Sequence, residues 1–342
     1  MIDTIKIFTM INIEIFKKIS NISNIKTSYD NETGQVFYKI INDHIFGNLN
    51  SSLSIRVGDG TKYNFINKYY IEIEGSYHKF VMGYNSHDGF YNLQLICINL
   101  INIVEKNYNV KLPNYNHWFL QRVDIAICYD LEKQDNIKLY INNLSKCNFP
   151  RRNLKYYENE SIYIAGTTTT LKIYNKLLEF YNNDYKKIKN LEFDLMEHLE
   201  KIKGFIRFEC EIKKRKLKDL VNKRYVRVNQ VFYKDLKDIW HEEFEKLLKI
   251  LNTDLIPIRN QDEVKYRLNN KFKRVRANHL FEFYIHILTR GINDVKGDLD
   301  KSSYYKNLSD LKKCGIDFSQ NLNLNTTKDY LDFNPFCSKE IL

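Results

Sequence analysis

The chain has 342 residues, a formal net charge of +11 and 43% hydrophobic residues. The hydrophobic content is sufficient for a sizeable core and excludes bulk disorder. The length fits one large domain or two smaller ones. The excess of Lys and Arg favours a polyanionic partner, either nucleic acid or an anionic membrane surface, with charge for solubility as the simple alternative.

Cysteine usage and hydropathy restrict the cellular environment. No two cysteines form a CxxC pair, so a zinc site is not expected. Cys128 and Cys210 lie in apolar strand patterns and are predicted to be buried thiols. The longest apolar run, residues 93–104, contains asparagines and is too short to cross a bilayer. We therefore expect a protein of the reducing cytoplasm without a membrane partner. The six cysteines are Cys97, Cys128, Cys147, Cys210, Cys314 and Cys337.

The first two-thirds of the chain alternates strand and helix patterns. Segments rich in β-branched and aromatic residues predict strands. Helical spacing predicts helices over residues 93–106, over 136–144 and from about 214. No regular βαβ rhythm and no Gly-rich phosphate loop occurs, which favours an α+β fold with a mainly antiparallel sheet. The predicted strands cover residues 5–15, 35–41, 54–57, 69–74, 120–129, 161–165, 169–176 and 205–213.

The last third of the chain is helical in pattern. Apolar residues recur at helical spacing over residues 232–251 and 280–288, and Ser302 or Ser303 is the expected cap of a further helix. We place a domain boundary near residue 222, which gives a domain of residues 1–222 and a helical region of residues 223–342. Within it, residues 278–316 are predicted to form either a helix-turn-helix-like DNA-binding segment or a cap over the sheet.

Several predicted strands have one apolar and one polar face. In the strand around Asp124, Val123 and Ile125 point one way, while Arg122 and Asp124 point the other. The simple explanation is an antiparallel sheet with one face in solvent. The other residues that the same alternation puts on polar faces include Glu72, Lys172, Tyr174, Lys176, Arg207, Glu209 and Lys213.

A catalytic site is the alternative explanation of the polar faces. Clustered carboxylates repel one another and call for a divalent cation, and an oxygen-rich set favours Mg²⁺ or Mn²⁺. Lysines beside such a cluster can hold a phosphate. The phenol oxygen of a tyrosine such as Tyr174 can attack phosphorus and store the bond energy in a covalent link. With 25 tyrosines in the chain, however, composition alone does not single out Tyr174.

Six short segments resemble, in the same order, the gene II/gene X replication proteins of filamentous phages. They include Arg-Val-Asp at residues 122–124, Tyr-Asn-Lys at 174–176 and Arg-Phe-Glu at 207–209. Each is weak alone, but their shared order along most of the chain is specific. The same three also resemble the plasmid initiators of the Rep_trans type. The other segments cover residues 1–5, 71–85 and 281–316.

The resemblance implies a relaxase-like, curved antiparallel sheet and a rolling-circle replication initiator. It implies that Tyr174 nicks one strand of origin DNA and forms a 5′-phosphotyrosine link, with Lys176 and Lys172 beside the phosphate. Double- and single-stranded origin DNA, host helicase and host polymerase are the implied partners, in the cytoplasm of a bacterial host cell. The implied metal ligands are Glu72, Asp124 and Glu209, and the expected DNA-binding residues are Lys79, Arg122, Arg207, Lys213, Lys306 and Lys312.

Two alternatives stay open. One is a DNA-binding replication regulator without catalysis, in which Tyr174 only stacks. The other is a metal-dependent nuclease that activates water and forms no covalent adduct.

Overall fold

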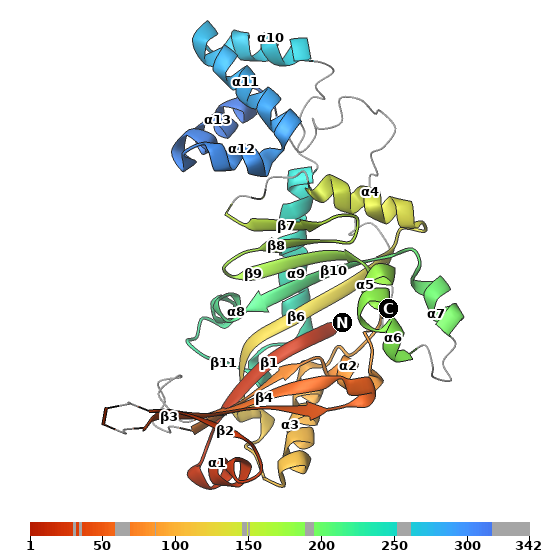
Figure 1. Ribbon diagram of the computed structural model, residues 1–342, viewed down its shortest axis with the longest axis vertical. Helices are drawn as coiled ribbons and strands as arrows, with labels where there is room; N and C mark the ends of the chain where they lie inside the picture. Colours follow the sequence, from red (N-terminus) through yellow and green to blue (C-terminus); the bar gives the residue numbers. More distant parts are fainter. Residues whose placement is uncertain are drawn as a thin grey trace.

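The computed structural model describes residues 1–29, 32–33, 36–58, 69–85, 87–145, 149, 151–188, 195–251 and 261–316. Cys147, Cys337 and residue 35, where the second strand was predicted to begin, lie outside these residues. The fold is α+β, with an 11-stranded sheet in the order β2-β3-β4-β5-β1-β6-β10-β9-β8-β7 and with β11 paired to β6. All of the strand pairs are antiparallel, which confirms the predicted fold class (Figure 1).

Strands and helices are interspersed up to residue 251, and only helices follow among the described residues. The strands are β1 (Ile2–Ile11), β2 (Ile25–Tyr29), β3 (Val36–Phe46), β4 (Ser52–Gly58), β5 (Tyr69–Gly75), β6 (Phe119–Asp130), β7 (Asn153–Tyr157), β8 (Ser161–Ala165), β9 (Thr169–Asn175), β10 (Phe205–Lys213) and β11 (Val226–Arg227). The α-helices are α1 (Ile13–Ser20), α2 (Tyr77–Met82), α3 (Leu93–Tyr108), α4 (Gln134–Ser145), α5 (Lys176–Asn183), α6 (Tyr185–Ile188), α7 (Leu195–Ile202), α8 (Lys214–Val221), α9 (Tyr233–Leu251), α10 (Gln261–Lys271), α11 (Arg274–Arg290), α12 (Ile292–Asp298) and α13 (Lys301–Lys313).

The first strand ends earlier than its composition predicts. Residues 5–15 are rich in isoleucine and phenylalanine, but β1 stops at Ile11. The side chain of Asn12 accepts a hydrogen bond from the backbone N–H of Ile15 at 2.9 Å and thereby caps α1. The cap satisfies a backbone donor that a strand would pair with a neighbour, so local capping outweighs strand propensity here.

One face of the sheet is apolar and is covered by helices. Ile73, Ile125, Ile173 and Phe208 come from four different strands and are fully buried in the main core. Helices α3, α4 and α9 pack on this side, and α9 runs behind β6 and β10 in Figure 1. Burial of this face supplies most of the driving force for folding, at roughly 25 cal/mol per Å² of apolar surface.

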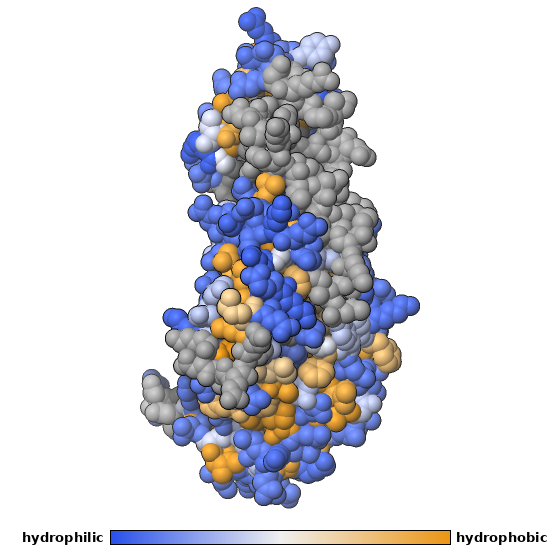
Figure 2. Space-filling view, turned by 90° about the vertical axis from the view of Figure 1, so that its right-hand side faces the viewer, coloured by the Kyte–Doolittle hydropathy of each residue, from blue (hydrophilic) through white to orange (hydrophobic). Residues whose placement is uncertain are grey.

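The opposite face of the sheet carries the polar residues that the alternation predicted. Helices α5, α6 and α7 lie beside one end of the strands (Figure 1). They enclose a small apolar cluster of their own, which includes Cys128, Phe180 and Phe205. The side of the molecule seen in Figure 2 is mostly hydrophilic, with hydrophobic residues gathered in its lower part. Among the described residues, no helix has both the length and the apolar character that a membrane span requires.

Helix α9 packs on the apolar face of the sheet, although the prediction placed it in the helical C-terminal region. The indole N–H of Trp240 donates to the carbonyl of Phe208 at 3.2 Å, and the hydroxyl of Thr169 donates to Glu243 at 2.5 Å. As a division into domains, the boundary near residue 222 stays a prediction. Among the described residues, α9 shares the main core with the sheet, and the buried residues of the second core begin at Val264. Helical spacing revealed α9 but not the surface against which it packs.

The fragment of residues 1–251 is expected to fold cooperatively, whereas residues 1–222 are not. Removing α9 exposes the apolar face of β10 around Phe208 and Cys210, which are fully buried in the intact chain. Thermal unfolding of both fragments, followed by circular dichroism, checks this. A cooperative transition of residues 1–222 at the midpoint of the longer fragment would contradict the packing described here.

Helices α10 to α13 form a unit with its own core. Leu268, Leu280, Tyr284 and Leu311 are fully buried within it. The predicted segment of residues 278–316 corresponds to most of α11 with α12 and α13, but Asp300 rather than a serine caps α13. Lys306 and Lys312 are exposed on α13. Their predicted contact with DNA stays a prediction.

Candidate active site

Tyr174 is the last residue but one of β9 and lies at the floor of a polar cleft of about 370 Å³. Its side chain is 7% exposed. The amide side chain of Asn175 caps α5 by accepting from the backbone N–H groups of Leu177 and Leu178, so the helix begins directly after the tyrosine. The residues that line the cleft include Asp3, Asn85, Tyr163, Lys172, Tyr174 and Glu209.

The phenol of Tyr174 has a carboxylate acceptor. Its hydroxyl donates to Oε2 of Glu209 on β10 at 3.2 Å. Burial raises the pKa of Tyr174 well above its ordinary value; Glu209 and Glu179 add to this effect and Arg207 opposes it. The phenol is therefore neutral at physiological pH, and an attack by its oxygen requires an acceptor for the proton. Glu209 is placed to be that acceptor.

Lys172 joins the carboxylates of three residues on two neighbouring strands. Its Nζ lies 2.5 Å from Glu209, 3.5 Å from Asp124 and 3.8 Å from Glu211. Burial alone would lower the pKa of Lys172, but Glu209 and Asp124 outweigh it and raise this pKa above its usual range. The side chain is 16% exposed and lines the cleft, so its charge is available to a bound anion.

Asp124 lies beneath this ammonium group and is fully buried. It accepts two hydrogen bonds from Arg122, at 2.7 Å to Nε and 2.5 Å to Nη2. Burial raises the pKa of Asp124 to about 7; nearby Glu209 adds to the rise, while Arg122 and Lys172 counteract it. A row of ion pairs continues across the polar face, because Glu74 lies 3.4 Å from Arg122 and 2.7 Å from Lys6.

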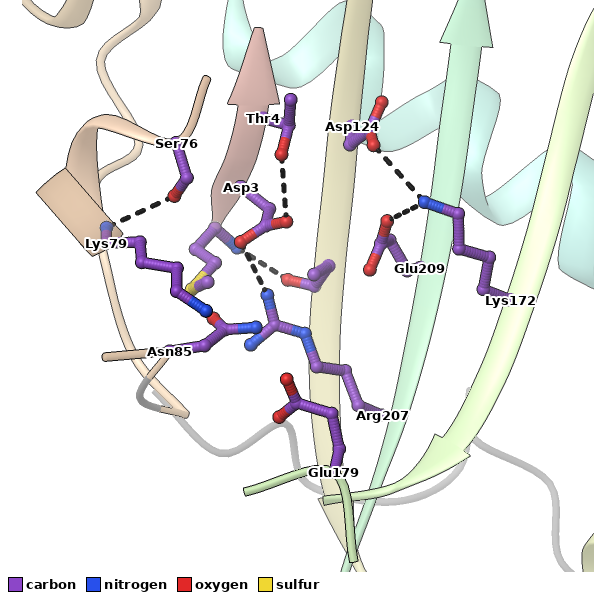
Figure 3. Close-up of polar contacts among 12 residues, drawn as sticks. Asp3, Thr4, Ser76, Lys79, Asn85, Asp124, Lys172, Glu179, Arg207 and Glu209 are labelled. Carbon is purple, nitrogen blue, oxygen red and sulfur yellow. Dashed lines mark hydrogen bonds and ion pairs between the residues drawn. The ribbon is translucent and has the colours of Figure 1, made fainter. Parts of the chain in front are cut away.

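Asp3 is a site residue that the alternation rule missed. In β1, Ile5 pairs with Val123 and Ile2 pairs with Ile125 on β6, so Asp3 and Thr4 together oppose one residue. Such a bulge redirects a side chain, and Asp3 turns to the polar face, where its carboxylate lies 3.1 Å from Arg207 (Figure 3). Burial would raise the pKa of Asp3, but the charges of Arg207 and two lysines lower it below its usual value.

The change Arg207→Met is expected to lower the free energy of unfolding by roughly 3–5 kcal/mol, the usual cost of leaving one buried charge without its partner. The guanidinium of Arg207 is 0% exposed, and it forms an ion pair with Asp3. Urea unfolding monitored by fluorescence measures the loss. In the double variant Asp3→Asn/Arg207→Met, much of the stability should return, and no return would mean that the pair is not the cause.

Three expected site residues lie elsewhere than predicted. Glu72 on β5 opposes Phe8 of β1, beside the cluster of Phe8 and Tyr70, and does not join Asp124 and Glu209. Neighbouring strands pair at a register that sequence alone does not give. Arg207 is fully buried and cannot serve as a surface contact to DNA. Lys176 is also fully buried, 2.7 Å from Glu179, so Lys172 rather than Lys176 reaches the cleft.

The predicted metal ligands do not fit a metal ion. Asp124 and Glu209 do come together, but the ammonium group of Lys172 lies between them. Glu72 supplies no third ligand there. Across the described ranges of the chain, no three His, Cys, Asp or Glu side chains gather as a metal site requires. Lys172 thus provides the counter-charge that the sequence pattern had assigned to a cation.

The expected DNA-binding residues of the sheet domain are in part engaged within the protein. Lys79 lies 3.0 Å from Asp184 and is 30% exposed. Lys213 donates to the carbonyl of Gly166 at 2.8 Å. Arg122 remains 26% exposed on the polar face although it pairs with Asp124. Contact of these three residues with DNA stays a prediction.

Asn85 is a further cleft residue; it ends the segment of residues 71–85 that carries the resemblance, but it was not among the expected site residues. Gly83 caps the C-terminal end of α2, and its φ of 85° is the left-handed conformation that favours glycine. The backbone N–H of Asn85 donates to Asp184 at 3.0 Å. The Asn85 side chain lies near Lys79 and Arg207 in Figure 3. The Gly-x-Asn spacing was the available signal, but nothing in it indicated the cleft.

Comparison with known families identifies the class of protein. Residues 1–234 match the model of the N-terminal part of a phage replication-associated protein, the product of gene II, and residues 269–332 match the model of its C-terminal part. The first match covers more than half of the chain. The protein therefore belongs to this family, the filamentous-phage gene II family, as the resemblance predicted.

Two curated relatives are similar over part of their length. The replication-associated protein of this family from Enterobacteria phage M13 is 26% identical over 170 residues, which cover 44% of this chain and 40% of the relative. Its counterpart from Enterobacteria phage f1 gives the same identity and coverage. The similarity thus spans less than half of these relatives. No solved structure matches the chain.

Proposed function

We propose that the protein initiates rolling-circle replication by nicking one strand of origin DNA with Tyr174 and later rejoining it. The observation that carries this proposal is the hydrogen bond from Tyr174 to Glu209 at the floor of an open polar cleft. A buried tyrosine with a carboxylate acceptor and an adjacent lysine has the parts of an activated nucleophile. Family membership supports a role in replication.

The first transfer forms the covalent link. The phenolic oxygen of Tyr174 attacks phosphorus, its proton passes to Oε2 of Glu209, and the bond from phosphorus to the 3′ oxygen breaks. The released 3′ oxygen takes a proton from solvent and becomes a hydroxyl that primes synthesis. Lys172, at the wall of the cleft, offsets the charge that develops on the phosphate oxygens.

The second transfer reverses the first. A 3′ hydroxyl attacks the phosphotyrosine and releases its proton to solvent, and the Tyr174 oxygen leaves and recovers its own proton from Glu209. No nucleotide cofactor is needed, because the phosphotyrosine link conserves the energy of the broken bond. Double- and single-stranded origin DNA are the substrates under this proposal, and host helicase and polymerase are its partners by family likeness.

Metal dependence, with Mg²⁺ or Mn²⁺ as the expected ion, remains part of the proposal without an assigned set of ligands. The steps above use only groups of the chain. The dependence is tested by running the same reaction with each ion and with a chelator. Loss of cleavage in chelator and its return on addition of Mn²⁺ would support a requirement for a metal ion.

A covalent-adduct experiment tests the proposed function. The protein is incubated with labelled origin DNA and the products are separated on a denaturing gel. We expect a labelled band at the mass of protein plus DNA. Cleavage without such a band would favour the water-using nuclease. Binding without cleavage would favour the non-catalytic regulator.

A further inference from the structure

The cleft extends beyond the reacting atoms over strand β8 and the end of α5. Ser161 opposes Tyr174 and Tyr163 opposes Lys172 across the β8–β9 pair, so all four side chains share the polar face. Glu160, just before β8, and Asn182 on α5 also line this part of the cleft. None of these four added residues is needed for the transfer to Tyr174.

Tyr163 gives this region an aromatic wall. Its ring is half-buried and meets the ring of Tyr157 edge to face at a centroid distance of 5.7 Å, which fixes its orientation. Burial raises the pKa of Tyr163, with Lys172 opposing and Glu209 adding to the rise, so its hydroxyl stays protonated. An aromatic ring beside a site of phosphoryl transfer is a surface on which a nucleobase can stack.

Glu160 and Asn182 give the same region a polar rim. The amide of Asn182 donates to Oε1 of Glu160 at 3.2 Å, and the backbone N–H of Asn175 donates to the carbonyl of Glu160 at 2.9 Å. The first contact engages the carboxylate, and the second fixes the backbone of Glu160 beside the end of β9; Glu160 lines the cleft. A carboxylate accepts up to about four hydrogen bonds, so the one from Asn182 leaves acceptor capacity for a ligand.

We propose that Tyr163, Glu160 and Asn182 form a subsite for one unpaired nucleobase, next to the phosphate that Tyr174 attacks. The base is one whose Watson–Crick edge carries an amino group beside an acceptor ring nitrogen, namely adenine or cytosine. The proposal rests on the proposed function and adds the identity of a flanking nucleotide. The cleft volume of about 370 Å³ lies within the range of pockets that hold small ligands.

Hydrogen-bond chemistry decides which bases fit. Amide side chains pair with the amino group and ring nitrogen of adenine, and carboxylates accept from the amino group of cytosine. Thymine presents carbonyl oxygens on both sides of its single N–H, and these oxygens would face the carboxylate of Glu160. A phosphate is also disfavoured at this rim, because its negative charge repels the carboxylate of Glu160.

Binding of short single strands to a protein that cannot cleave them tests the subsite. Fluorescence anisotropy is measured for six-nucleotide strands of dA, dC and dT with the Tyr174→Phe variant. We expect dA and dC to bind about 10-fold more tightly than dT, as one base contact of about 1–3 kcal/mol predicts. Adding Glu160→Gln and Asn182→Ala should abolish this preference. Adding Tyr163→Ala should weaken the binding of all three strands by about 10-fold, because a stacking contact is lost.

The matched control is Glu158→Gln, which removes one exposed carboxylate of the turn between β7 and β8 without touching the cleft lining. It should leave the preference intact. Equal binding of the three strands, or a preference that survives the rim changes, would overturn the subsite. The result is independent of nicking: wild-type protein that shows the preference but forms no adduct would refute the proposed function and leave the subsite standing.

Discussion

Replacing Tyr174 by phenylalanine is expected to abolish the covalent adduct and to reduce strand cleavage by about 10⁴-fold or more, the scale seen when a catalytic nucleophile is removed. The change deletes one oxygen atom and keeps the ring, so the packing of β9 is preserved. The lost hydroxyl is the donor to Glu209 at 3.2 Å. Quantification of the shifted band and of the cleaved product on one denaturing gel measures both effects.

The control for this experiment is Tyr181→Phe. Tyr181 lies on α5, further along the chain, and is 41% exposed. Tyr181→Phe should leave the cleavage rate within about 2-fold of the original rate, since substitutions of exposed residues usually have small effects. DNA binding by the Tyr174→Phe protein should also persist. An adduct that survives in Tyr174→Phe would assign the nucleophile to another residue.

The change Glu209→Gln is expected to slow cleavage by about 10²–10⁴-fold at neutral pH, the range for removal of a general base. Glutamine has nearly the same shape, but its amide takes no proton from the phenol. Because the pKa of Tyr174 lies well above its ordinary value, the unassisted phenolate is scarce below about pH 10. The cleavage rate of the variant should therefore rise steadily with pH, without a plateau up to about pH 10.

A rate-against-pH series for the original protein and the Glu209→Gln variant provides the measurement. The companion variant Glu211→Gln removes a neighbouring carboxylate that lies 3.8 Å from Lys172 and stands opposite Thr170 rather than Tyr174 on β9. It should slow cleavage far less than the change at Glu209. If the two variants behave alike, or if Glu209→Gln keeps the original pH profile, Glu209 is not the proton acceptor.

Much of the fold could be predicted because the strands in question are strongly patterned. The alternation around Asp124 and Glu209 identified β6 and β10, and also which of their faces is polar. Helical spacing likewise identified α3 and α9. Fold class followed from these elements, since long alternating strands without crossover helices form antiparallel sheets.

The parts of the site that sequence missed depend on register and on local irregularity. Glu72 and Asp124 both lie on polar faces, but their strands pair through β1 at positions that keep them apart. Asp3 reaches the site only because a bulge adds one residue to β1. No pattern in a single strand reveals its register against a neighbouring strand, so the sequence alone could not bring ligands from three strands together.

The position of β1 in the sheet sets when the site can exist during synthesis. This strand precedes the other strands in the sequence, yet it lies between β5 and β6 in the sheet. Strand β10 (residues 205–213) pairs with the far side of β6. The ion pair of Asp3 with Arg207 therefore cannot form until more than two hundred further residues have been synthesised. Pairing between strands far apart in the sequence slows folding, because the entropy cost of closing a long loop comes before the stabilising contacts form. A nascent chain that stops before β10 carries the tyrosine strand but not its proton acceptor.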